Sequence, residues 1–280
     1  MKGTKMTDNY ALIGCPLGHS LSPQIHTRLF ELAGIKFQYD LTEIKPEDLK
    51  DKYDYLKSLK GFNITIPHKI AIIDFCDDLS EGAKRYGSVN CIKNENGKST
   101  GYNTDVLGFV KSIEQLGASL NSKVCLLGCG GVGRMMAIEA AYQGADLTIA
   151  VRTEDIPVAE GVKAEIKKLL PDNRVNVIHL SEMAGGFDSV INATPVGMYP
   201  KTEFSPLNKE QLKNVSFLFD AIYNPTHTTL SRYAEEMGAK TSTGMAMLVL
   251  QAVAAHEIWN GSEYKQSDID ILIKDMEKLV

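Results

Sequence analysis

The sequence predicts an α/β protein with two domains, of which the second is a doubly wound, Rossmann-type dinucleotide-binding domain. Strand-like and helix-like segments alternate along all 280 residues, which is typical of largely parallel sheets. The alternation restarts at Lys123, where an apolar strand leads directly into a glycine-rich turn. A chain of 280 residues is also long enough for two ordinary domains of roughly 150 residues each.

The first half is predicted to contain short strands separated by two helices. Each helix begins beside a proline and ends before a glycine, and apolar residues alternate with polar ones in two of the strands. Ser22 is predicted to cap the first helix, and Phe62, Ile64 and Ile66 to share one apolar strand face. The expected elements are strands at 11–13, 35–41, 62–66 and 88–92, helices at 22–33 and 46–60, and a turn at 94–97.

The second half is predicted to be a parallel sheet with covering helices. Its expected strands lie at 124–127, 147–151, 175–178, 189–193 and 217–219, and a helix follows the glycine-rich turn as far as Gly144. The apolar helical segment from Met245 to Trp259 is expected to pack back on the first half. The predicted organisation is therefore a substrate-binding and catalytic domain at 1–108, a cofactor domain at 109–244, and C-terminal helices at 245–280 that return to the first domain.

Composition and charge exclude several classes of protein. Thirty basic and 35 acidic residues are interspersed and leave a net charge of −5, so no nucleic-acid partner is expected. No apolar run approaches the ~18–20 residues that a membrane helix needs, and the polar N-terminal segment does not resemble a secretory signal. The five cysteines are odd in number and lack a C-x-x-C pair, which indicates free thiols in a reducing, cytoplasmic setting.

The six histidines show no metal-ligand spacing, so no metal site is expected. Three of them lie in the first half of the chain. We expect these side chains to pack or to cap rather than to act as ligands: His19, His26 and His68.

The segment Gly128-Cys129-Gly130-Gly131-Val132-Gly133 matches the G-x-G-x-x-G fingerprint. It follows an apolar strand and opens a helix, which is the context that makes this short motif informative. The first glycine forms the tight turn, the second lets backbone approach a pyrophosphate, and the third lets the helix pack on the strand. The free N–H groups of the helix N-terminus attract the pyrophosphate, so the segment predicts dinucleotide binding.

Arg152 follows the next predicted strand and bears on which dinucleotide is bound. An acidic residue at this point binds a ribose 2′-hydroxyl, whereas an arginine accommodates a 2′-phosphate. Arg152 therefore favours NADP over NAD. Glu154 and Asp155 follow immediately and keep NAD open as an alternative.

Polar residues cluster at predicted strand ends in the first half, where α/β proteins bind ligands. Ser20 and Ser22 bring two hydroxyls to a helix N-terminus and suit a small carboxylate. Thr65 lies opposite the apolar strand face, and Lys69 follows just past the strand end. Asn90 and Asp105 are polar residues at similar positions, so these strand ends predict a substrate pocket.

Across essentially the whole chain, the sequence resembles the shikimate dehydrogenase family. Nine segments carry the resemblance in the family's order, and together they are far more specific than any one alone. They are residues 20–23, 63–69, 87–90, 103–105, 128–133, 152–153, 192–198, 220–225 and 244–251. The resemblance implies an enzyme of the aromatic amino-acid pathway that reversibly reduces 3-dehydroshikimate to shikimate with NADPH.

The resemblance also implies roles for individual residues. Lys69 and Asp105 would form the catalytic pair. The substrate-binding set would be Ser20, Ser22, Thr65, Lys69, Asn90, Asp105, Tyr223 and Gln251. The cofactor-binding set would be Glu81, Gly128, Cys129, Gly130, Gly131, Val132, Gly133, Arg152, Thr153, Thr194, Met198, Ala221 and Gly244.

Two positions depart from the family pattern. Val151 stands where many members have an asparagine before Arg152-Thr153, which weakens the expectation of adenosine binding there. Cys129 replaces the commoner alanine inside the glycine-rich turn, and it should be tolerated because backbone groups contact the cofactor.

Other functions stay open on the sequence alone. A quinate/shikimate dehydrogenase that uses NAD or NADP is the nearest, but relatives that prefer quinate often carry threonine in place of the second serine, here Ser22. A non-catalytic ligand-sensing homologue should lack Lys69 or Asp105, and a folate-linked methylene dehydrogenase fits the paired serines poorly. We expect a small-molecule substrate, no membrane or nucleic-acid partner, and a monomer or homodimer.

Overall fold

The computed structural model describes residues 7–18 and 20–280, so His19 lies outside the described residues. The chain divides into two compact units. The first contains the described residues up to Gly108 together with Val249–Met276, and the second contains Phe109–Leu248 and Glu277–Val280. The chain leaves the first unit within helix α4 (Thr104–Leu116) and returns to it within helix α8 (Gly244–Asn260).

The first unit is built on a six-stranded mixed sheet with the order β2-β1-β3-β5-β6-β4. Strand β1 pairs in parallel with β2 and β3, whereas β5 runs antiparallel to both β3 and β6. The carboxyl ends of β1 and β3 therefore meet the amino end of β5. The strands are β1 (Asp8–Gly14), β2 (Phe37–Glu43), β3 (Gly61–Ile64), β4 (Asp78–Leu79), β5 (Cys91–Glu95) and β6 (Lys98–Tyr102).

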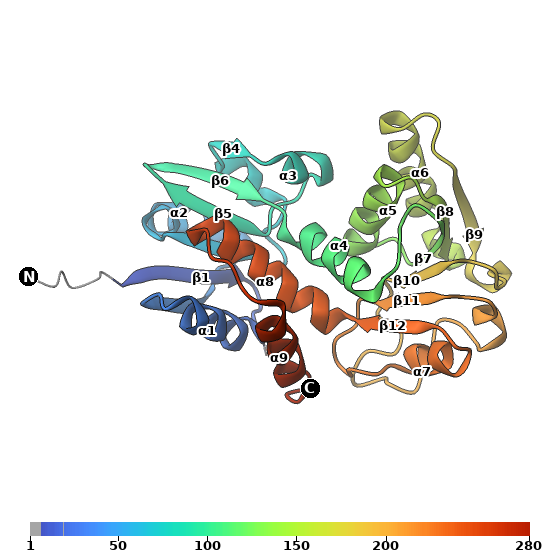
Figure 1. Ribbon diagram of the computed structural model, residues 1–280. Coiled ribbons are helices and arrows are strands. Elements are labelled where there is room, and N and C mark those ends of the chain that lie inside the picture. The colour runs from blue at the N-terminus through green and yellow to red at the C-terminus, as the bar shows by residue number, and fades with distance from the viewer. Residues whose placement is uncertain (1–6, 19) are drawn as a thin grey trace, which may run out of the picture. The chain divides into compact units, whose positions relative to one another are not determined.

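Both faces of this sheet are buried. One face packs with residues of α2 in a core that includes Leu56 and Phe62. On the other face, the C-terminal part of α8 runs beside β5 and β1 (Figure 1), and Trp259 packs there with Tyr10 and Phe30. The helices of this unit are α1 (Ser22–Ala33), α2 (Leu49–Ser58), α3 (Glu81–Tyr86) and α9 (Gln266–Glu277), with 3₁₀ turns at Pro46–Asp48 and Ala71–Phe75.

The second unit is built on a six-stranded, all-parallel sheet with the order β12-β11-β10-β7-β8-β9. Read from the other edge, this is the 3-2-1-4-5-6 order of the Rossmann fold. The order reverses between β7 and β10, and ligands bind at such a switch point in doubly wound sheets. The strands are β7 (Lys123–Leu127), β8 (Asp146–Val151), β9 (Val175–His179), β10 (Ser189–Asn192), β11 (Phe217–Asp220) and β12 (Lys240–Thr243).

Helices cover both faces of the second sheet. Helix α7 contributes Leu230 and Ala234 to a core that includes Cys125 and Leu127 of β7, while α5 and α6 lie together on the other side in Figure 1. The helices are α5 (Gly131–Tyr142), α6 (Ile156–Leu169) and α7 (Thr229–Glu236), with 3₁₀ turns at Thr153–Asp155, Leu180–Glu182 and Glu210–Leu212. The doubly wound fold class predicted from the sequence is confirmed.

Several local predictions for the first half were wrong. Strand β2 begins at Phe37 rather than at residue 35, because the N–H of Ile35 donates to the carbonyl of Phe30 and closes the end of α1. Strand β3 ends at Ile64, so Ile66 is 73% exposed and does not share the apolar face. Ser22 is the first helical residue rather than the cap, and its N–H donates to Ser20 Oγ at 3.2 Å.

Strand β5 covers 91–95 rather than 88–92, and β6 forms its antiparallel partner after the predicted turn. Strands β4, β6 and β12 were not anticipated from the sequence. Among the described residues, no helix combines the length and the apolar character needed to cross a membrane. The five cysteines are all unpaired.

Candidate active site

Lys69 and Asp105 form an ion pair at the carboxyl edge of the first sheet. Lys69 lies in the turn after β3, and Asp105 lies in the first turn of α4. The distance from Lys69 Nζ to Asp105 Oδ2 is 2.7 Å, and the two side chains are 27% and 19% exposed. The pair is thus fixed in geometry yet open to solvent and substrate, which suits a group that exchanges protons.

Asn90 holds the second oxygen of the Asp105 carboxylate. Its Nδ2 donates to Asp105 Oδ1 at 2.8 Å and to Thr104 Oγ1 at 3.0 Å, while its Oδ1 accepts the backbone N–H of Thr104 at 2.6 Å. Thr104 Oγ1 lies 3.3 Å from Gln251 Oε1, to which it can donate. Four of the predicted substrate residues, namely Lys69, Asn90, Asp105 and Gln251, therefore belong to one network.

Sheet pairing explains why these side chains meet. The carbonyl of Asn90 accepts the N–H of Ile64, and the carbonyl of Lys69 accepts the N–H of Val89 at 2.8 Å. The turn after β3 is thereby fixed beside the segment that precedes β5. Thr65 follows β3 directly, and its N–H donates to the carbonyl of Ile13 in β1, so Thr65 lies at the same edge of the sheet.

Gly14 ends β1 next to Thr65. A Cβ added at Gly14 would overlap the Thr65 methyl group, so only glycine lets the two strand ends approach this closely. Ser20 lies between this end of β1 and α1, and Ser22 is the first residue of α1. The N–H of Ser22 donates to Ser20 Oγ and so joins the two residues. Within the described residues, no hydrogen bond joins the two serines to the Lys69 network.

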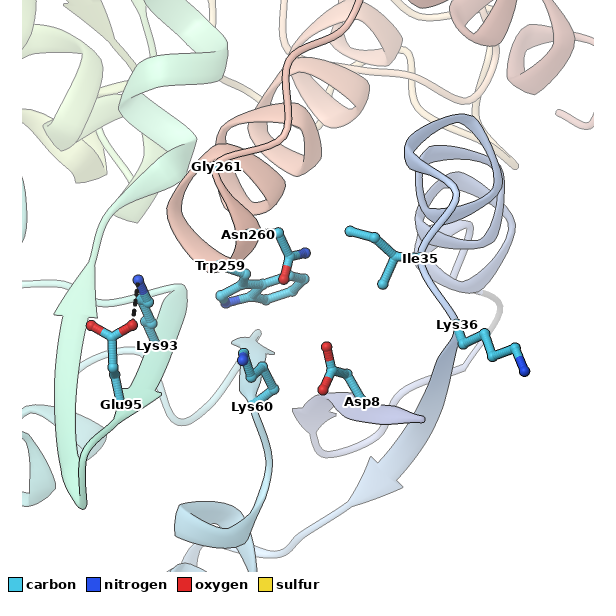
Figure 2. A pocket seen from close by; sticks show the side chains of 9 residues that line it. All are labelled: Asp8, Ile35, Lys36, Lys60, Lys93, Glu95, Trp259, Asn260 and Gly261. Atoms are coloured by element: carbon cyan, nitrogen blue, oxygen red, sulfur yellow. Dashed lines mark ion pairs between the residues drawn. The ribbon is translucent and has the colours of Figure 1, made fainter. Parts of the chain in front are cut away.

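A separate pocket of about 540 Å³ opens at the opposite edge of the same sheet (Figure 2). It lies at the amino ends of β1 and β3, where Asp8 and Lys60 line it together with Trp259. Lys93 and Glu95 also line it and form an ion pair, with Nζ and Oε1 3.2 Å apart. This pocket contains none of the predicted catalytic or substrate residues, so the candidate site is the Lys69 network.

The glycine-rich turn of the second unit has the geometry that its motif predicts. Gly128 has a φ of +84° immediately after β7, and a Cβ there would lie 2.8 Å from the Thr194 methyl carbon. A Cβ at Gly133 would lie 2.6 Å from the carbonyl oxygen of Gly128, so the helix packs closely on the turn. Apart from chain neighbours and the backbone of the same helix, no described atom lies within 4 Å of a Cβ built at Gly130 or Gly131. This free space in front of the α5 N-terminus fits a pyrophosphate.

The remaining residues of the turn do not obstruct that space. Cys129 is 7% exposed, and burial raises the pKa of its thiol to about 11, so the side chain is a neutral, inward-facing group. Val132 is 41% exposed at the start of the helix. The replacement of alanine by Cys129 is therefore accommodated in the interior.

Arg152 lies on the surface just after β8, next to Thr153. Its guanidinium donates to Asp155 Oδ2 from Nε at 3.0 Å and from Nη2 at 2.8 Å, and Nη1 lies 3.2 Å from Glu154 Oε1. The bond to Asp155 and the charges of both carboxylates raise the pKa of Arg152. The two acids that follow Arg152 therefore hold the side chain that the sequence assigns to a 2′-phosphate.

Three further predicted cofactor residues lie at the carboxyl edge of the second sheet, on loops after β10 and β11 or at the start of α8. The N–H of Thr194 donates to Asn192 Oδ1 at 3.0 Å, and the N–H of Ala221 donates to the carbonyl of Asn192 at 2.9 Å. The N–H of Gly244 donates to the carbonyl of Ile222 at 3.0 Å, and a Cβ at Gly244 would overlap Ala221. Thr194 therefore lies beside the switch point, next to Gly128, whereas Ala221 and Gly244 lie at the neighbouring strand ends.

The last three predicted residues are Met198, Tyr223 and Glu81. Met198 is 46% exposed on the loop after β10, and Tyr223 is 37% exposed on the loop after β11, both in the second unit. Glu81 lies in the first unit at the start of α3, with its carboxylate 3.8 Å from Lys84 Nζ. In residues 7–18 and 20–280, no three His, Cys, Asp or Glu side chains are grouped so that they could hold a metal ion.

Three residues of these networks had no role assigned from the sequence. Thr104 joins Asn90 to Gln251, and Asn192 and Asp220 join the loops after β10 and β11. Each lies inside a segment that carried the family resemblance, which was the available signal. Their partners depend on which strands are neighbours, so the motif alone does not reveal them.

Taken together, the strand order, the glycine-rich turn and the lysine–aspartate pair define an α/β dehydrogenase with a dinucleotide-binding unit. The profile of the shikimate dehydrogenase substrate binding domain matches residues 12–92. A shikimate dehydrogenase (NADP(+)) of Methanococcus maripaludis is 39% identical over 255 residues, covering 89% of this chain and 91% of its own. One from Caldanaerobacter subterraneus is 37% identical, with 93% and 94% covered.

Solved structures agree. A crystal structure of shikimate dehydrogenase in complex with NADP+ is 35% identical and has a TM-score of 0.87, with 96% of each chain covered. The enzyme of Thermus thermophilus in complex with NADP(H) and shikimate is 28% identical and has a TM-score of 0.85, with 96% of this chain and 99% of that chain covered. The chain belongs to the shikimate dehydrogenase family, as the sequence resemblance predicts.

Proposed function

We propose that this protein is an NADP-dependent shikimate dehydrogenase that reversibly reduces 3-dehydroshikimate to shikimate. The observation that carries the proposal is the Lys69–Asp105 pair, with Nζ and Oδ2 2.7 Å apart at the carboxyl edge of the first sheet. Family membership supports the same reaction, since relatives at 35–39% identity are named as the NADP(+) enzyme. The reaction belongs to the chorismate route to aromatic amino acids.

We assign the substrate to the Lys69 network and the residues around it. Ser20 and Ser22 would hold the substrate carboxylate, since two hydroxyls at a helix N-terminus suit an anion. The other assigned contacts are to the hydroxyls and the reacting oxygen of the substrate. They are Thr65, Lys69, Asn90, Asp105, Gln251 and, from the second unit, Tyr223.

NADP(H) fits the second unit because the space at Gly130 and Gly131 is open and the N-terminus of α5 presents free N–H groups. Arg152 and Thr153 are the residues we assign to the 2′-phosphate, and Thr194, Met198, Ala221 and Gly244 to the nicotinamide end. Glu81 is a weaker assigned contact from the first unit. When bound, NADPH supplies the hydride that reduces the ketone.

Lys69 is the proton donor and acceptor of this reaction. As the substrate carbonyl oxygen gains negative charge, the Lys69 ammonium donates a proton from Nζ to that oxygen. In the reverse direction, neutral Lys69 accepts the proton of the alcohol. Asp105 holds Nζ in position through Oδ2, while Asn90 holds Oδ1 and so keeps the carboxylate from turning.

The same proposal covers the partners, the oligomeric state and the location of the protein. Its partner is a small-molecule substrate, with no role for nucleic acid, membrane or metal in the chemistry, and a monomer or homodimer would suffice. Five unpaired thiols are suited to the reducing conditions of the cytoplasm.

The experiment is to measure oxidation of NADPH and of NADH with 3-dehydroshikimate and with 3-dehydroquinate in parallel. We expect the highest kcat/KM for NADPH with 3-dehydroshikimate. A higher value with 3-dehydroquinate would instead identify a quinate-type enzyme, despite Ser22. No oxidation with either ketone by folded protein that binds NADPH would overturn the proposal and favour a sensing role.

A further inference from the structure

Asp220 is a buried carboxylate that the proposed chemistry does not use. It ends β11 at the carboxyl edge of the second sheet, and its side chain is 0% exposed. Burial raises the pKa of Asp220, whereas hydrogen bonds from three neighbours lower it. A carboxylate in the interior is costly unless its oxygens accept hydrogen bonds, so the partners of Asp220 show what this residue holds in place.

Each oxygen of Asp220 accepts hydrogen bonds from defined partners. Oδ1 accepts Asn192 Nδ2 at 2.9 Å and the backbone N–H of Ile222 at 3.1 Å. Oδ2 accepts the hydroxyl of Thr228 at 2.7 Å, and the same hydroxyl oxygen accepts the N–H of Ser231 at the start of α7. The carboxylate thus joins the end of β10, the loop after β11 and a helix N-terminus.

Asn192 extends the network to the loop after β10. Its side chain is 0% exposed, and its amide is oriented by the bond from Nδ2 to Asp220. The Oδ1 atom can then accept both the N–H and the hydroxyl of Thr194, at 3.0 and 2.7 Å. Thr194 Oγ1 in turn accepts the N–H of Val196 at 3.3 Å.

We infer that Asp220 is a positioning residue for the cofactor site, which fixes the loops carrying Thr194 and Ala221 in their binding conformations. The inference rests on the proposed function, because those two loops carry the residues assigned to NADP(H). A small displacement of groups that contact a bound ligand costs about 10-fold or more in affinity or rate. Loss of the Asp220 carboxylate frees the donors on Asn192, Ile222 and Thr228 together.

The Asp220→Ala and Asp220→Asn variants separate the effect of the hydrogen bonds from the effect of changing any buried residue. Alanine leaves all three donors without their acceptor. Asparagine keeps an acceptor at the Oδ1 position, and its new amide N–H can donate to the Thr228 hydroxyl oxygen, whose proton can turn to Ser231 Oγ, 3.1 Å away. We therefore expect Asp220→Asn to retain the network and Asp220→Ala to lose it.

A matched control is Asn173→Ala in the same unit. Asn173 donates to the carbonyls of Ala141 and Ala145 at 3.0 and 3.4 Å, before the amino end of β8 and so at the opposite edge of the sheet. This variant also removes two hydrogen bonds, which are partly buried, but it does not touch either cofactor loop. Its effect measures what a general loss of stability does to binding.

Two readouts test the inference. Amide hydrogen exchange of the cofactor-free protein reports on the loops at 193–198 and 221–226, and calorimetric titration gives the dissociation constant of NADPH. We expect Asp220→Ala to speed exchange in both loops and to weaken NADPH binding about 10-fold. Asp220→Asn and Asn173→Ala should each stay within about twofold of the wild type.

If Asp220→Ala fails to fold, Thr228→Val removes a single donor and should change both readouts in the same direction by a smaller factor. Unchanged exchange in both loops of a folded Asp220→Ala or Thr228→Val protein would overturn the inference, as would equal weakening of NADPH binding by Asn173→Ala. If wild-type protein does not bind NADPH, the proposed function fails, while the exchange measurement still decides the role of Asp220.

Discussion

The contact between His26 and His256 predicts that the first unit loses stability in mild acid. Both side chains are fully buried, and His26 Nδ1 lies 3.1 Å from His256 Nε2. His256 Nδ1 lies 2.8 Å from the hydroxyl oxygen of Tyr264. Burial lowers the pKa of His256 to about 3, and burial together with the neighbouring His256 lowers the pKa of His26 well below its ordinary value.

The sign and size of the effect follow from these shifts. In the unfolded chain, a histidine has a pKa of about 6.5, so between pH 6.5 and pH 3 the unfolded state binds more protons than the folded state. The stability that the two neutral, buried histidines contribute to the folded state is fully present above pH 6.5 and is lost as the pH falls below that value. Between pH 7 and pH 5, His256 alone lowers the free energy of unfolding by about 2 kcal/mol, at ~1.4 kcal/mol per pH unit below pH 6.5. His26 contributes in the same direction.

Trp259 allows the pH dependence of unfolding to be measured in the first unit. It is the single tryptophan of the chain, and its ring centroid lies 5.7 Å from that of His256. Urea unfolding followed by its fluorescence at pH 7, 6 and 5 gives the free energy of unfolding at each pH. His256→Gln should lower stability at every pH but reduce the loss between pH 7 and pH 5 by about 2 kcal/mol.

His227→Gln is the control, because this histidine is exposed and lies in the second unit. It should leave the pH dependence of the Trp259 signal unchanged. The free energy of unfolding could instead fall by the same amount between pH 7 and pH 5 in wild-type and His256→Gln proteins. In that case the buried histidines do not cause the acid sensitivity, and the reasoning from their burial is wrong.

Three further predictions concern activity and the C-terminal segment. Lys69→Ala should lower kcat by about 10²–10⁴-fold with a much smaller change in KM, as steady-state kinetics would show, because the positioned proton donor is lost. Arg152→Ala should raise the KM for NADPH by about 10–100-fold and leave that for NADH nearly unchanged, whereas Arg174→Ala, also an exposed arginine paired with an aspartate, should change neither. A chain ending at Gly244 should lose shikimate binding in calorimetry and show early thermal unfolding of its first unit, because Val249–Met276 completes that unit.

Each of these has an outcome that contradicts it. Retention of more than half of kcat by Lys69→Ala, with hydride transfer limiting the wild-type rate, would remove Lys69 as the proton donor. Equal effects of Arg152→Ala on both cofactors would show that Arg152 does not distinguish the 2′-phosphate. A shortened chain whose first unit unfolds at the wild-type temperature would show that the returning segment is dispensable.

The parallel sheet of the second unit was predictable because its strands are buried on both faces. Such strands are continuous apolar runs, and the glycine-rich turn identifies the first of them, β7. Short polar or edge elements leave no comparable pattern. Strand β4 has two residues, and β12 is an edge strand with the polar sequence Lys-Thr-Ser-Thr, so neither was anticipated.

The candidate site was predictable to the level of residue types at strand ends. Lys69 and Asp105 follow predicted strands at the edge where ligands bind, but their pairing and catalytic role came from the family resemblance. The residues that orient them were harder to find, because their partners are set by strand order. Asn192 bonds to Asp220 only because β10 and β11 are neighbours, and nothing in the local sequence specifies that pairing.

The aromatic core of the first unit draws on both ends of the chain, and this has a consequence during synthesis. Tyr10 donates a hydrogen bond to Asn260, 250 residues later, and packs against Trp259. A ribosome adds about 5–20 residues per second, so Tyr10 and its neighbours wait on the order of 10–50 s for the helix that covers them.

During that interval the whole stretch Phe109–Leu248 emerges as one uninterrupted segment, with a complete sheet of its own. The second unit can therefore finish folding on the ribosome while the first still exposes an apolar sheet face to solvent. A nascent chain in this state is a natural client for chaperones that bind hydrophobic surface, and slow translation of the second half prolongs its exposure.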